Sequence, residues 1–307
     1  MLGALGLREP LWARPALDLA VRRPARRFAL QVLAFDDIVG QKGLSAAASW
    51  LLGQYAPAWT ACGQSCVPRD GPALIVSNHP GLFDTLILFA AIDRADLLVI
   101  AADRPFLRAL PNVSRCVLYV AEDAGAQLGL VRATARHLRQ GGAILTFPGG
   151  KIEPDPALQA GAVDALSGWS ESLGLFVRLA PNTPVIPAIV SGVLAKGAQH
   201  HPLTRIRRRQ RDREWLGAML QLMAPSRWPV APRVDFGRPV MTTSLGASPV
   251  GSTRWHLQVA QNAPAEVRAA VLVEACRLIE ACQAPGGGVF VRRQFTAGSA
   301  DLAGPPR

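Results

Sequence analysis

A histidine and an aspartate five positions apart give the clearest chemical signal in this sequence, within the run Asn78-His79-Pro80-Gly81-Leu82-Phe83-Asp84. The run follows a short apolar segment that reads as a strand, so its Pro-Gly turn would place the imidazole at the rim of a sheet. Asp84 could accept a hydrogen bond from one ring nitrogen and leave the other nitrogen free as a base. Such a base can take the proton of an attacking hydroxyl, whose own pKa lies far above neutrality. The alternative interpretation is a satisfied core histidine and an aspartate that only caps a helix, because this spacing also arises by chance.

A second candidate site is the turn Phe147-Pro148-Gly149-Gly150-Lys151, which follows another apolar run and precedes Glu153. Its two glycines allow the backbone to approach a ligand closely, and a cation and an anion come next. The turn could therefore hold an anionic group, with Lys151 as a point charge on a phosphate. The alternative is an ordinary glycine turn with an exposed lysine.

Short β-rich runs alternate with helical stretches from about Gly71 onward, which predicts an α/β fold with a mixed β-sheet flanked by helices. The predicted strands span residues 73–77, 97–101, 116–120, 143–147, 185–190 and 233–236. The predicted helices span residues 84–92, 125–140 and 264–283, after a helical lead-in. Pro187 inside its strand predicts an edge position or a bulge. Both candidate turns follow strands, so we expect the active site at the strand rim, beneath a positive groove formed by residues 147–151.

With these motifs in this order, the sequence resembles the PlsC-like glycerolipid acyltransferase family, which includes the lysophosphatidic acid (1-acylglycerol-3-phosphate) acyltransferases. Asn78, His79 and Asp84 match the first block of that family, Asn-His-x4-Asp. The turn at residues 147–151 stands where the family carries Phe-Pro-Glu-Gly followed by Thr or Ser. The later matches are Val185-Ile186-Pro187-Ala188 and Val234-Asp235-Phe236-Gly237-Arg238-Pro239. The resemblance covers about residues 71 to 240.

The resemblance implies an O-acyltransferase that moves a fatty acyl group from acyl-CoA or acyl-carrier protein to a hydroxyl of a (lyso)phospholipid or related lipid acceptor. In that interpretation His79 is the general base and Asp84 orients it. No cofactor is implied, because the thioester donor is a substrate. Direct transfer fits, since the sequence has no Gly-x-Ser-x-Gly elbow and no cysteine beside a matched base. The expected substrate-binding residues are Asn78, Arg104, Arg115, Phe147, Pro148, Gly149, Gly150, Lys151 and Glu153.

Two positions depart from the family pattern, and both concern the acceptor. Gly149 replaces a glutamate that helps to hold the acceptor in the family, and Glu153 is the nearest carboxylate that could substitute. The family also carries a phosphate-binding arginine after its second strand, where this sequence has Ala-Glu-Asp at residues 121–123. Arg104 and Arg115 are nearby candidates to compensate. A sugar, polyol or other lipid hydroxyl is therefore as open an acceptor as a glycerol phosphate.

The chain is basic, with a formal net charge of +11, which favours an anionic partner such as a phospholipid surface, a phosphorylated substrate or nucleic acid. An insertion at about residues 199–232 crowds six arginines before an apolar helical segment with tryptophans at its ends. This pattern is typical of an interfacial membrane contact, and a solvated arginine loop beside a packed helix explains it equally well. The alternative function is a non-catalytic membrane-lipid or nucleic-acid binding protein that uses this insertion, whereas the enzyme interpretation expects no nucleic acid.

The remaining features indicate a compartment and a domain plan. Five cysteines at spacings that suit neither a zinc ribbon nor a disulfide framework indicate reduced thiols in the cytoplasm. The sequence has neither a secretory signal nor an apolar run of membrane-spanning length, so we expect a cytoplasmic protein peripheral to the inner face of the membrane. No metal is expected, because His79 and Asp84 lack further ligands at recognisable spacing. We expect a helical segment over residues 1–60, an acyltransferase domain over 61–284 and a flexible tail over 285–307.

Overall fold

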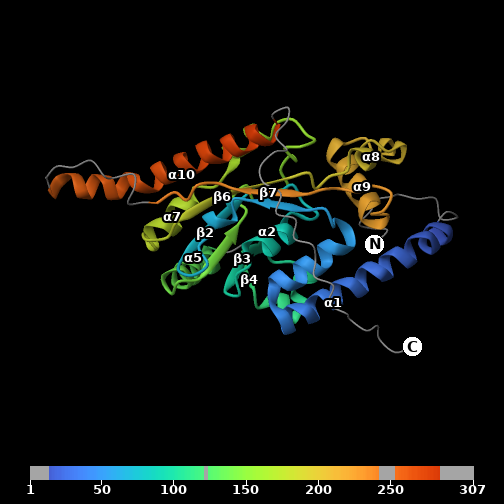
Figure 1. The fold of residues 1–307 in the computed structure, drawn as a ribbon, viewed down its shortest axis with the longest axis horizontal. Coiled ribbons are helices and arrows are strands. Elements are labelled where there is room, and N and C mark those ends of the chain that lie inside the picture. Colours follow the sequence, from blue (N-terminus) through green and yellow to red (C-terminus); the bar gives the residue numbers. More distant parts are fainter. Residues whose placement is uncertain (1–13, 121–123, 242–252, 284–307) are drawn as a thin grey trace.

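A seven-stranded mixed sheet lies between two layers of helices in the computed structural model, which describes residues 14–120, 124–241 and 253–283 (Figure 1). The strand order is β1-β7-β6-β2-β5-β3-β4. In chain order, the strands are β1 (Thr60–Cys62), β2 (Ala73–Ser77), β3 (Leu97–Ala102), β4 (Val117–Val120), β5 (Ala143–Thr146), β6 (Val185–Ser191) and β7 (Arg233–Phe236). Strands β2 to β6 run parallel to one another, whereas β7 is antiparallel to β6 and β1 follows the direction of β7. The predicted mixed sheet flanked by helices is therefore confirmed.

The helices among the described residues occupy both faces of this sheet. The longer ones are α1 (Arg14–Tyr55, kinked at Gly43), α2 (Asp84–Ile92), α5 (Ala124–Arg139), α7 (Ser172–Leu179), α9 (Gln210–Met223) and α10 (Thr253–Gln283). The short helices are α3 (Pro105–Arg108), α4 (Pro111–Ser114), α6 (Ala162–Ala165) and α8 (Lys196–Gln199), with 3₁₀ turns η1 (Gln64–Cys66), η2 (Leu166–Gly168) and η3 (Pro202–Ile206). None of the helices in the described ranges combines the length and apolar character that a membrane span requires.

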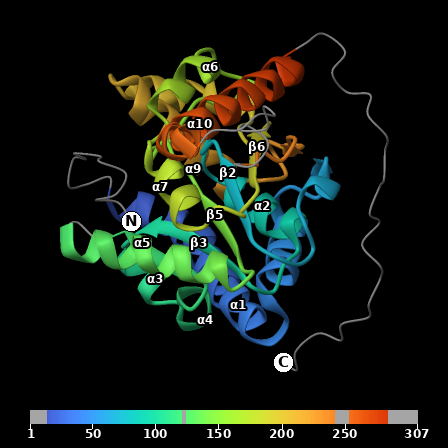
Figure 2. The same cartoon turned by 90° about the vertical axis from the view of Figure 1, so that its left-hand side faces the viewer.

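Strand β2 shows how the sequence produces these layers. All five of its residues are buried, as expected for a parallel strand covered on both faces. Ile75 joins the apolar cluster beneath α1 and α2, whereas Leu74 and Val76 join the cluster beneath α5, α7 and α10 (Figure 2). This alternation follows from the two-residue period of a strand. A central strand fixed from both sides gives a rigid base for the loop that follows it.

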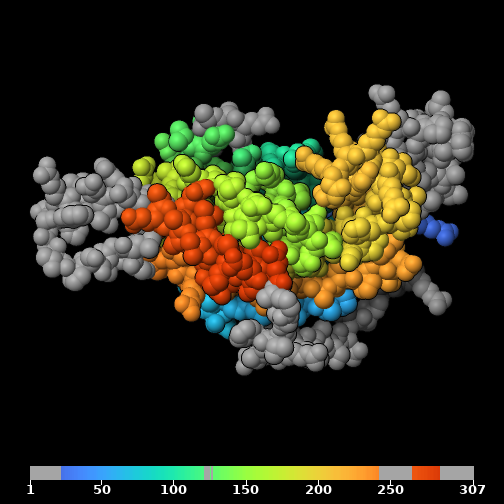
Figure 3. All heavy atoms as spheres, turned by 90° about the horizontal axis from the view of Figure 1, so that it is seen from above, coloured from blue at the N-terminus to red at the C-terminus, as the bar shows by residue number. Residues whose placement is uncertain are grey.

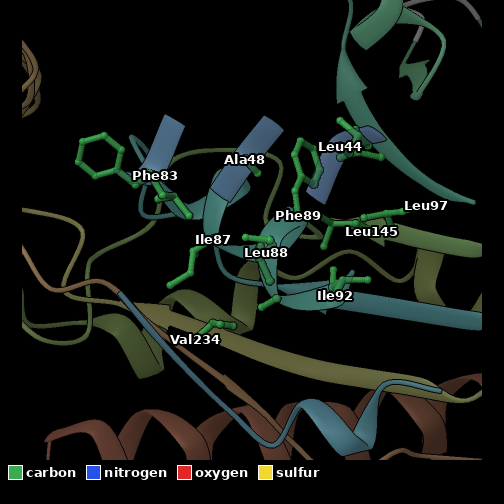
Figure 4. Close-up of a cluster of buried hydrophobic side chains, with 14 of the residues drawn as sticks. Leu44, Ala48, Phe83, Ile87, Leu88, Phe89, Ile92, Leu97, Leu145 and Val234 are labelled. Carbon is green, nitrogen blue, oxygen red and sulfur yellow. The ribbon is translucent and has the colours of Figure 1, made fainter. Parts of the chain in front are cut away.

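Helix α2 is held between α1 and the sheet. Leu44 and Ala48 of α1 lie beside the buried side chains of Ile87, Leu88 and Phe89 (Figure 4). Burial of each large side chain stabilises the fold by about 1.5–3 kcal/mol. Because Asp84 is the first residue of α2, this packing also fixes the position of the carboxylate that faces His79.

The expected edge position of Pro187 is wrong, because β6 lies inside the sheet between β2 and β7. The alternative, a bulge, is confirmed, since Ala188 pairs with Phe236 and Val185 with Val240, which leaves one extra residue on the partner segment. The carbonyl of Pro187 accepts a hydrogen bond from the backbone N–H of Gly237, one residue beyond the end of β7. In an antiparallel ladder the N–H and C=O of one residue face the same neighbouring strand, so the nitrogen of Pro187 also faces Gly237. The missing N–H therefore costs the sheet a single bond next to the bulge, where a proline is tolerated.

The other predicted elements of the domain are confirmed with small shifts of their ends. Helix α5 ends at Arg139, just before the two glycines at 141 and 142, and α10 begins well before residue 264. The predicted tail at 285–307 and the Ala-Glu-Asp segment at 121–123 lie outside the described residues.

Candidate active site

The candidate site lies where β2, β5 and β6 end side by side. In the register of β2 and β5, Val76 is opposite Thr146, so the loops that follow the two strands leave the same edge of the sheet. The rings of His79 and Phe147 pack together there, with 4.6 Å between their centroids and 33° between their planes. The parallel sheet therefore brings together two motifs that are far apart in the sequence.

His79 and Asp84 form a direct hydrogen-bonded pair. The distance between His79 Nδ1 and Asp84 Oδ2 is 2.7 Å, and the Asp84 side chain is 1% exposed. With Asp84 ionised, Nδ1 carries the proton and donates it, which leaves the lone pair of Nε2 free. The imidazole itself is 30% exposed, so a substrate can reach it.

The carboxylate of Asp84 is fixed by donors other than His79. Its Oδ2 also accepts from the backbone N–H of Gly81 at 2.7 Å, and its Oδ1 accepts from the N–H and hydroxyl of Thr85. The turn that allows these bonds has left-handed backbone at both Gly81 (φ 90°) and Leu82 (φ 53°). Such a conformation is unfavourable for leucine, and residues held in this way gather at functional sites.

Glu153 is a second carboxylate that contacts His79, through the backbone. Its Oε2 accepts from the N–H of His79 at 2.9 Å, and its own N–H donates to the carbonyl of His79 at 2.9 Å. Its Oε1 accepts from the indole Nε1 of Trp169 at 2.8 Å. Glu153 is 4% exposed. The loop after β5 is therefore tied by a buried carboxylate to the turn that carries His79.

The two carboxylates shift the pKa of the histidine. Burial alone would lower the pKa of His79, but the hydrogen bond and charge of Asp84, with the charge of Glu153, raise it above its usual value of 6.5. Burial raises the pKa of Glu153, while its bonds from Trp169 and His79 act in the opposite direction. The free base form of His79, which a general base requires, therefore grows as the pH rises through this elevated pKa.

Gly149 makes room for the carboxylate of Glu153. A Cβ atom at residue 149 would lie 2.7 Å from Glu153 Oε1 and 2.8 Å from Glu153 Cδ. These distances are too short for any side chain unless Glu153 moves. The glycine and the glutamate four residues later thus depend on each other. A contact of Glu153 with the acceptor, in place of the family's glutamate, stays a prediction.

The other predicted residues of this turn have varied positions. Phe147 stacks on His79, and the buried Pro148 accepts a hydrogen bond from the N–H of Ser170 through its carbonyl. Gly150 closes the turn, with its N–H donating to the carbonyl of Phe147. Lys151 is exposed and contributes a positive charge near Glu153.

The side chain of Asn78 links β2 to β6 next to the site. Its side chain accepts from the N–H of Val190 at 2.7 Å and donates to the carbonyl of Val190 at 2.9 Å, and the residue is 3% exposed. Both groups of the amide are therefore bonded to β6, where they hold the end of β2. Its expected contact with substrate is corrected to a positioning role.

The two predicted arginines lie at opposite ends of the parallel strands. Arg104 is exposed just after β3, at the carboxyl edge that also carries His79. Arg115 comes two residues before β4, whose first residue, Val117, is opposite Val99 of the parallel β3. The structure therefore does not bring Arg115 to the site, because the amino ends of parallel strands lie at the edge away from His79.

A groove of about 1090 Å³ opens beside the turn that carries His79. One wall comes from Pro80, Gly81 and Leu82, and a second comes from the loop at residues 152–160. The third wall is the segment of α8, η3 and α9, which stands beside the yellow-green residues after β5 in Figure 3. The cationic side chains in the lining are Arg205, Arg207, Arg211 and Arg213. The positive groove thus differs from the prediction, which formed it from residues 147–151. Its positive charge comes from the arginine insertion, and none of residues 147–151 lines it.

Two buried groups of the site were not anticipated. Trp169 holds Glu153 and has no local sequence signal, because it lies sixteen residues away. Asp155 is fully buried and accepts from the N–H groups of Gly192 and Leu194 just after β6. Its setting between Pro154 and Pro156 is a turn signal that could have identified it. Within the described residues, no group of three or more His, Cys, Asp or Glu side chains is arranged to hold a metal ion.

Comparison with known proteins gives one family-model match over the residues of this site. Residues 60–191 match the family model described as Acyltransferase, and this range runs from the start of β1 to the end of β6. No curated protein matches the chain. The chain is similar to a solved structure, the crystal structure of the 1-acyl-sn-glycerophosphate (LPA) acyltransferase PlsC from Thermotoga maritima. That similarity has 16% sequence identity and a TM-score of 0.43, and it covers 86% of this chain and 83% of the other. The range matched by the family model holds His79, Asp84 and Glu153.

Proposed function

We propose that this chain transfers a fatty acyl group from a thioester donor to a hydroxyl of a (lyso)phospholipid or related lipid, with His79 as general base. The donor would be acyl-CoA or acyl-carrier protein. The observation that carries the proposal is the 2.7 Å bond from His79 to a buried Asp84, which leaves Nε2 of a 30% exposed ring free. The next three residues, Pro80, Gly81 and Leu82, line the adjacent groove. The acyltransferase-family match over the same residues supports it.

The reaction follows from this arrangement. Nε2 of His79 takes the proton of the acceptor hydroxyl as its oxygen attacks the thioester carbonyl, and a tetrahedral intermediate forms. Asp84 stabilises the resulting imidazolium and keeps the ring in the required tautomer. When the intermediate collapses, the C–S bond breaks, and the imidazolium returns its proton to the departing thiolate. The products are an ester and a free thiol, and His79 is again neutral.

Positioning groups around the ring keep this geometry in place. The ring of Phe147 packs against one side of the imidazole, and the two bonds between Glu153 and the backbone of His79 fix the turn. Holding a base within reach of a bound hydroxyl removes much of the entropic barrier to the reaction. This support explains why the catalytic turn can keep its left-handed leucine.

A lipid acceptor at the membrane surface is consistent with the side chains around the groove. Ile152 and Trp215 line it and are 57% and 41% exposed, and Ile206, next to two lining arginines, is 65% exposed. Exposed large apolar groups beside cations suit an amphipathic substrate or an anionic bilayer surface. We therefore propose that the protein works at the inner face of the cytoplasmic membrane.

The test is an acceptor panel with purified protein. Labelled acyl-CoA and acyl-carrier protein would each be incubated with lysophospholipids, monoacylglycerol and glycolipids, and ester formation would be followed by thin-layer chromatography. Transfer to at least one lipid hydroxyl, lost in His79→Ala, is the expected result. Transfer to none of them with either donor, together with binding of the same lipids, would instead favour a non-catalytic lipid-binding protein.

A further inference from the structure

The arginine insertion faces the groove with side chains that the acyl-transfer chemistry does not use. Arg205 lies in η3 and Arg211 in the first turn of α9, and both line the groove together with the catalytic turn. Both are exposed, and neither forms an ion pair with any residue in the described ranges. They therefore present two available guanidinium groups to whatever occupies the groove.

The backbone that carries these arginines is well fixed. Arg213 donates from Nε to the carbonyl of Arg207 at 2.7 Å, and Thr204 bonds to the carbonyls of Gln199 and His201. Gln221 of α9 is 1% exposed and bonds to the backbone of Val193 and Ala195, next to β6. The segment is thus anchored to the strand that also holds Asn78, which makes it a wall of the site.

The lining combines this positive wall with apolar surface. Its carboxylates are Glu153, already bonded to Trp169 and His79, together with Asp212 and Glu214. Four arginines exceed these three, so the wall is positive on balance. The apolar part of the lining includes Leu82, Ile152, Leu158, Trp215 and Met219. A ligand that fits this groove has an anionic group and an apolar body.

We propose that Arg205 and Arg211 form a binding subsite for a phosphate group of the substrate. The planar guanidinium forms paired, charge-assisted hydrogen bonds with phosphate, which makes arginine the preferred side chain for this contact. The inference rests on the proposed function and extends it, since it gives the substrate a phosphate bound in the groove beside the turn that carries His79. The phosphate belongs either to the acceptor headgroup or to the CoA of the donor.

Two double variants of equal charge test this subsite. Arg205→Ala/Arg211→Ala removes two arginines that line the groove, whereas Arg208→Ala/Arg209→Ala removes two exposed neighbours that are not part of its lining. The first should lower kcat/KM for a phosphate-bearing substrate by roughly 10- to 100-fold, as expected for loss of charge-assisted hydrogen bonds. The second should change it by less than about threefold.

Matched substrates identify the source of the phosphate. Lysophosphatidic acid against monoacylglycerol tests the acceptor, and acyl-CoA against S-acyl-pantetheine, which carries no phosphate, tests the donor. In one of these pairs, the loss caused by Arg205→Ala/Arg211→Ala should disappear when the phosphate is absent. Equal losses for both double variants, or a loss that ignores the phosphate in both pairs, would overturn the subsite and indicate general attraction to anionic surfaces.

Direct binding separates this proposal from the proposed function. Isothermal titration of lysophosphatidic acid and CoA into the wild type and both double variants needs no turnover. Weaker binding of one of these ligands to Arg205→Ala/Arg211→Ala alone would support the subsite even if no acyl transfer is found. Unchanged binding of both ligands, with acyl transfer intact, would remove the subsite and leave the enzyme assignment standing.

Discussion

The mutual dependence of Gly149 and Glu153 gives a quantitative prediction, because the two residues compete for one space. The Cβ of Gly149→Ala would lie 2.7 Å, 2.8 Å and 3.2 Å from Oε1, Cδ and Oε2 of Glu153. The carboxylate cannot simply rotate away, since it is buried and accepts from Trp169 and from the N–H of His79. An alanine at 149 should therefore break at least one of these bonds.

The magnitude follows from the bonds at stake. A hydrogen bond to a charged group contributes about 1.5–3 kcal/mol, so Gly149→Ala should lower the free energy of unfolding by roughly 2–4 kcal/mol. All three close atoms belong to the Glu153 side chain beyond its Cβ, so the clash disappears in a Glu153→Ala background. There the same substitution should cost less than about 0.5 kcal/mol. The expected coupling energy, which is the difference between the two costs, is thus about 1.5–4 kcal/mol.

Urea unfolding of the four proteins in this double-mutant cycle measures the coupling. Gly168→Ala is a matched control, because a Cβ at that position meets nothing within 4 Å, and it should leave the stability nearly unchanged. In the same samples, kcat/KM should fall in Gly149→Ala because the turn that carries His79 loses its tie. Additive costs of the two substitutions would refute the idea that they share one space.

Three further predictions concern the groups around His79. Asp84→Asn removes the charge and the ionic hydrogen bond that raise the pKa of His79, so the acidic limb of the kcat/KM profile should move to lower pH. The same change should reduce kcat by roughly 10³- to 10⁴-fold, because the required tautomer is no longer enforced. Glu153→Gln removes a smaller contribution to that pKa, so the limb should move in the same direction by less. Asn78→Ala should lower the free energy of unfolding by about 2–4 kcal/mol in a urea titration, because it leaves the buried backbone groups of Val190 unpaired.

Each of these outcomes can fail in a distinct way. A limb that stays in place or moves to higher pH in Asp84→Asn would contradict the assigned hydrogen bond, provided that circular dichroism shows a native fold. An equal or larger displacement in Glu153→Gln would mean that Glu153, and not Asp84, dominates the environment of the ring. If Asn78→Ala unfolds at the same free energy as the wild type but loses catalysis, Asn78 contacts the substrate and does not act by positioning β2.

The sequence predicted the sheet, its flanking helices and the His79–Asp84 pair because local patterns encode them. The strand at 73–77 has a fully apolar core, and the turn and helix start that follow it are short-range features. For Pro187, the bulge is confirmed but the edge position is wrong, because the order of the strands depends on distant partners. Arg115 was grouped with the site because it is near in sequence, although strand direction places it at the other edge.

Contacts between distant segments could not be derived from local patterns. Trp169 reaches Glu153 across sixteen residues, and Asn78 reaches Val190 across 112. The arginine insertion was ambiguous as a sequence because a basic helix start has the same pattern whether it faces lipid, solvent or a groove. Only the fold shows that Arg205 and Arg211 line the same groove as Leu82.

The most direct test of the account is the rate of acyl transfer by His79→Ala compared with the wild type. Purified proteins with the same circular dichroism would be assayed with labelled acyl thioester and the best lipid acceptor from the panel. A general base normally contributes about 10²- to 10⁴-fold to the rate, so His79→Ala should lower kcat by at least about 10²-fold. Lipid binding should be retained. A variant that transfers the acyl group at the wild-type rate would contradict the assignment of His79 as the base.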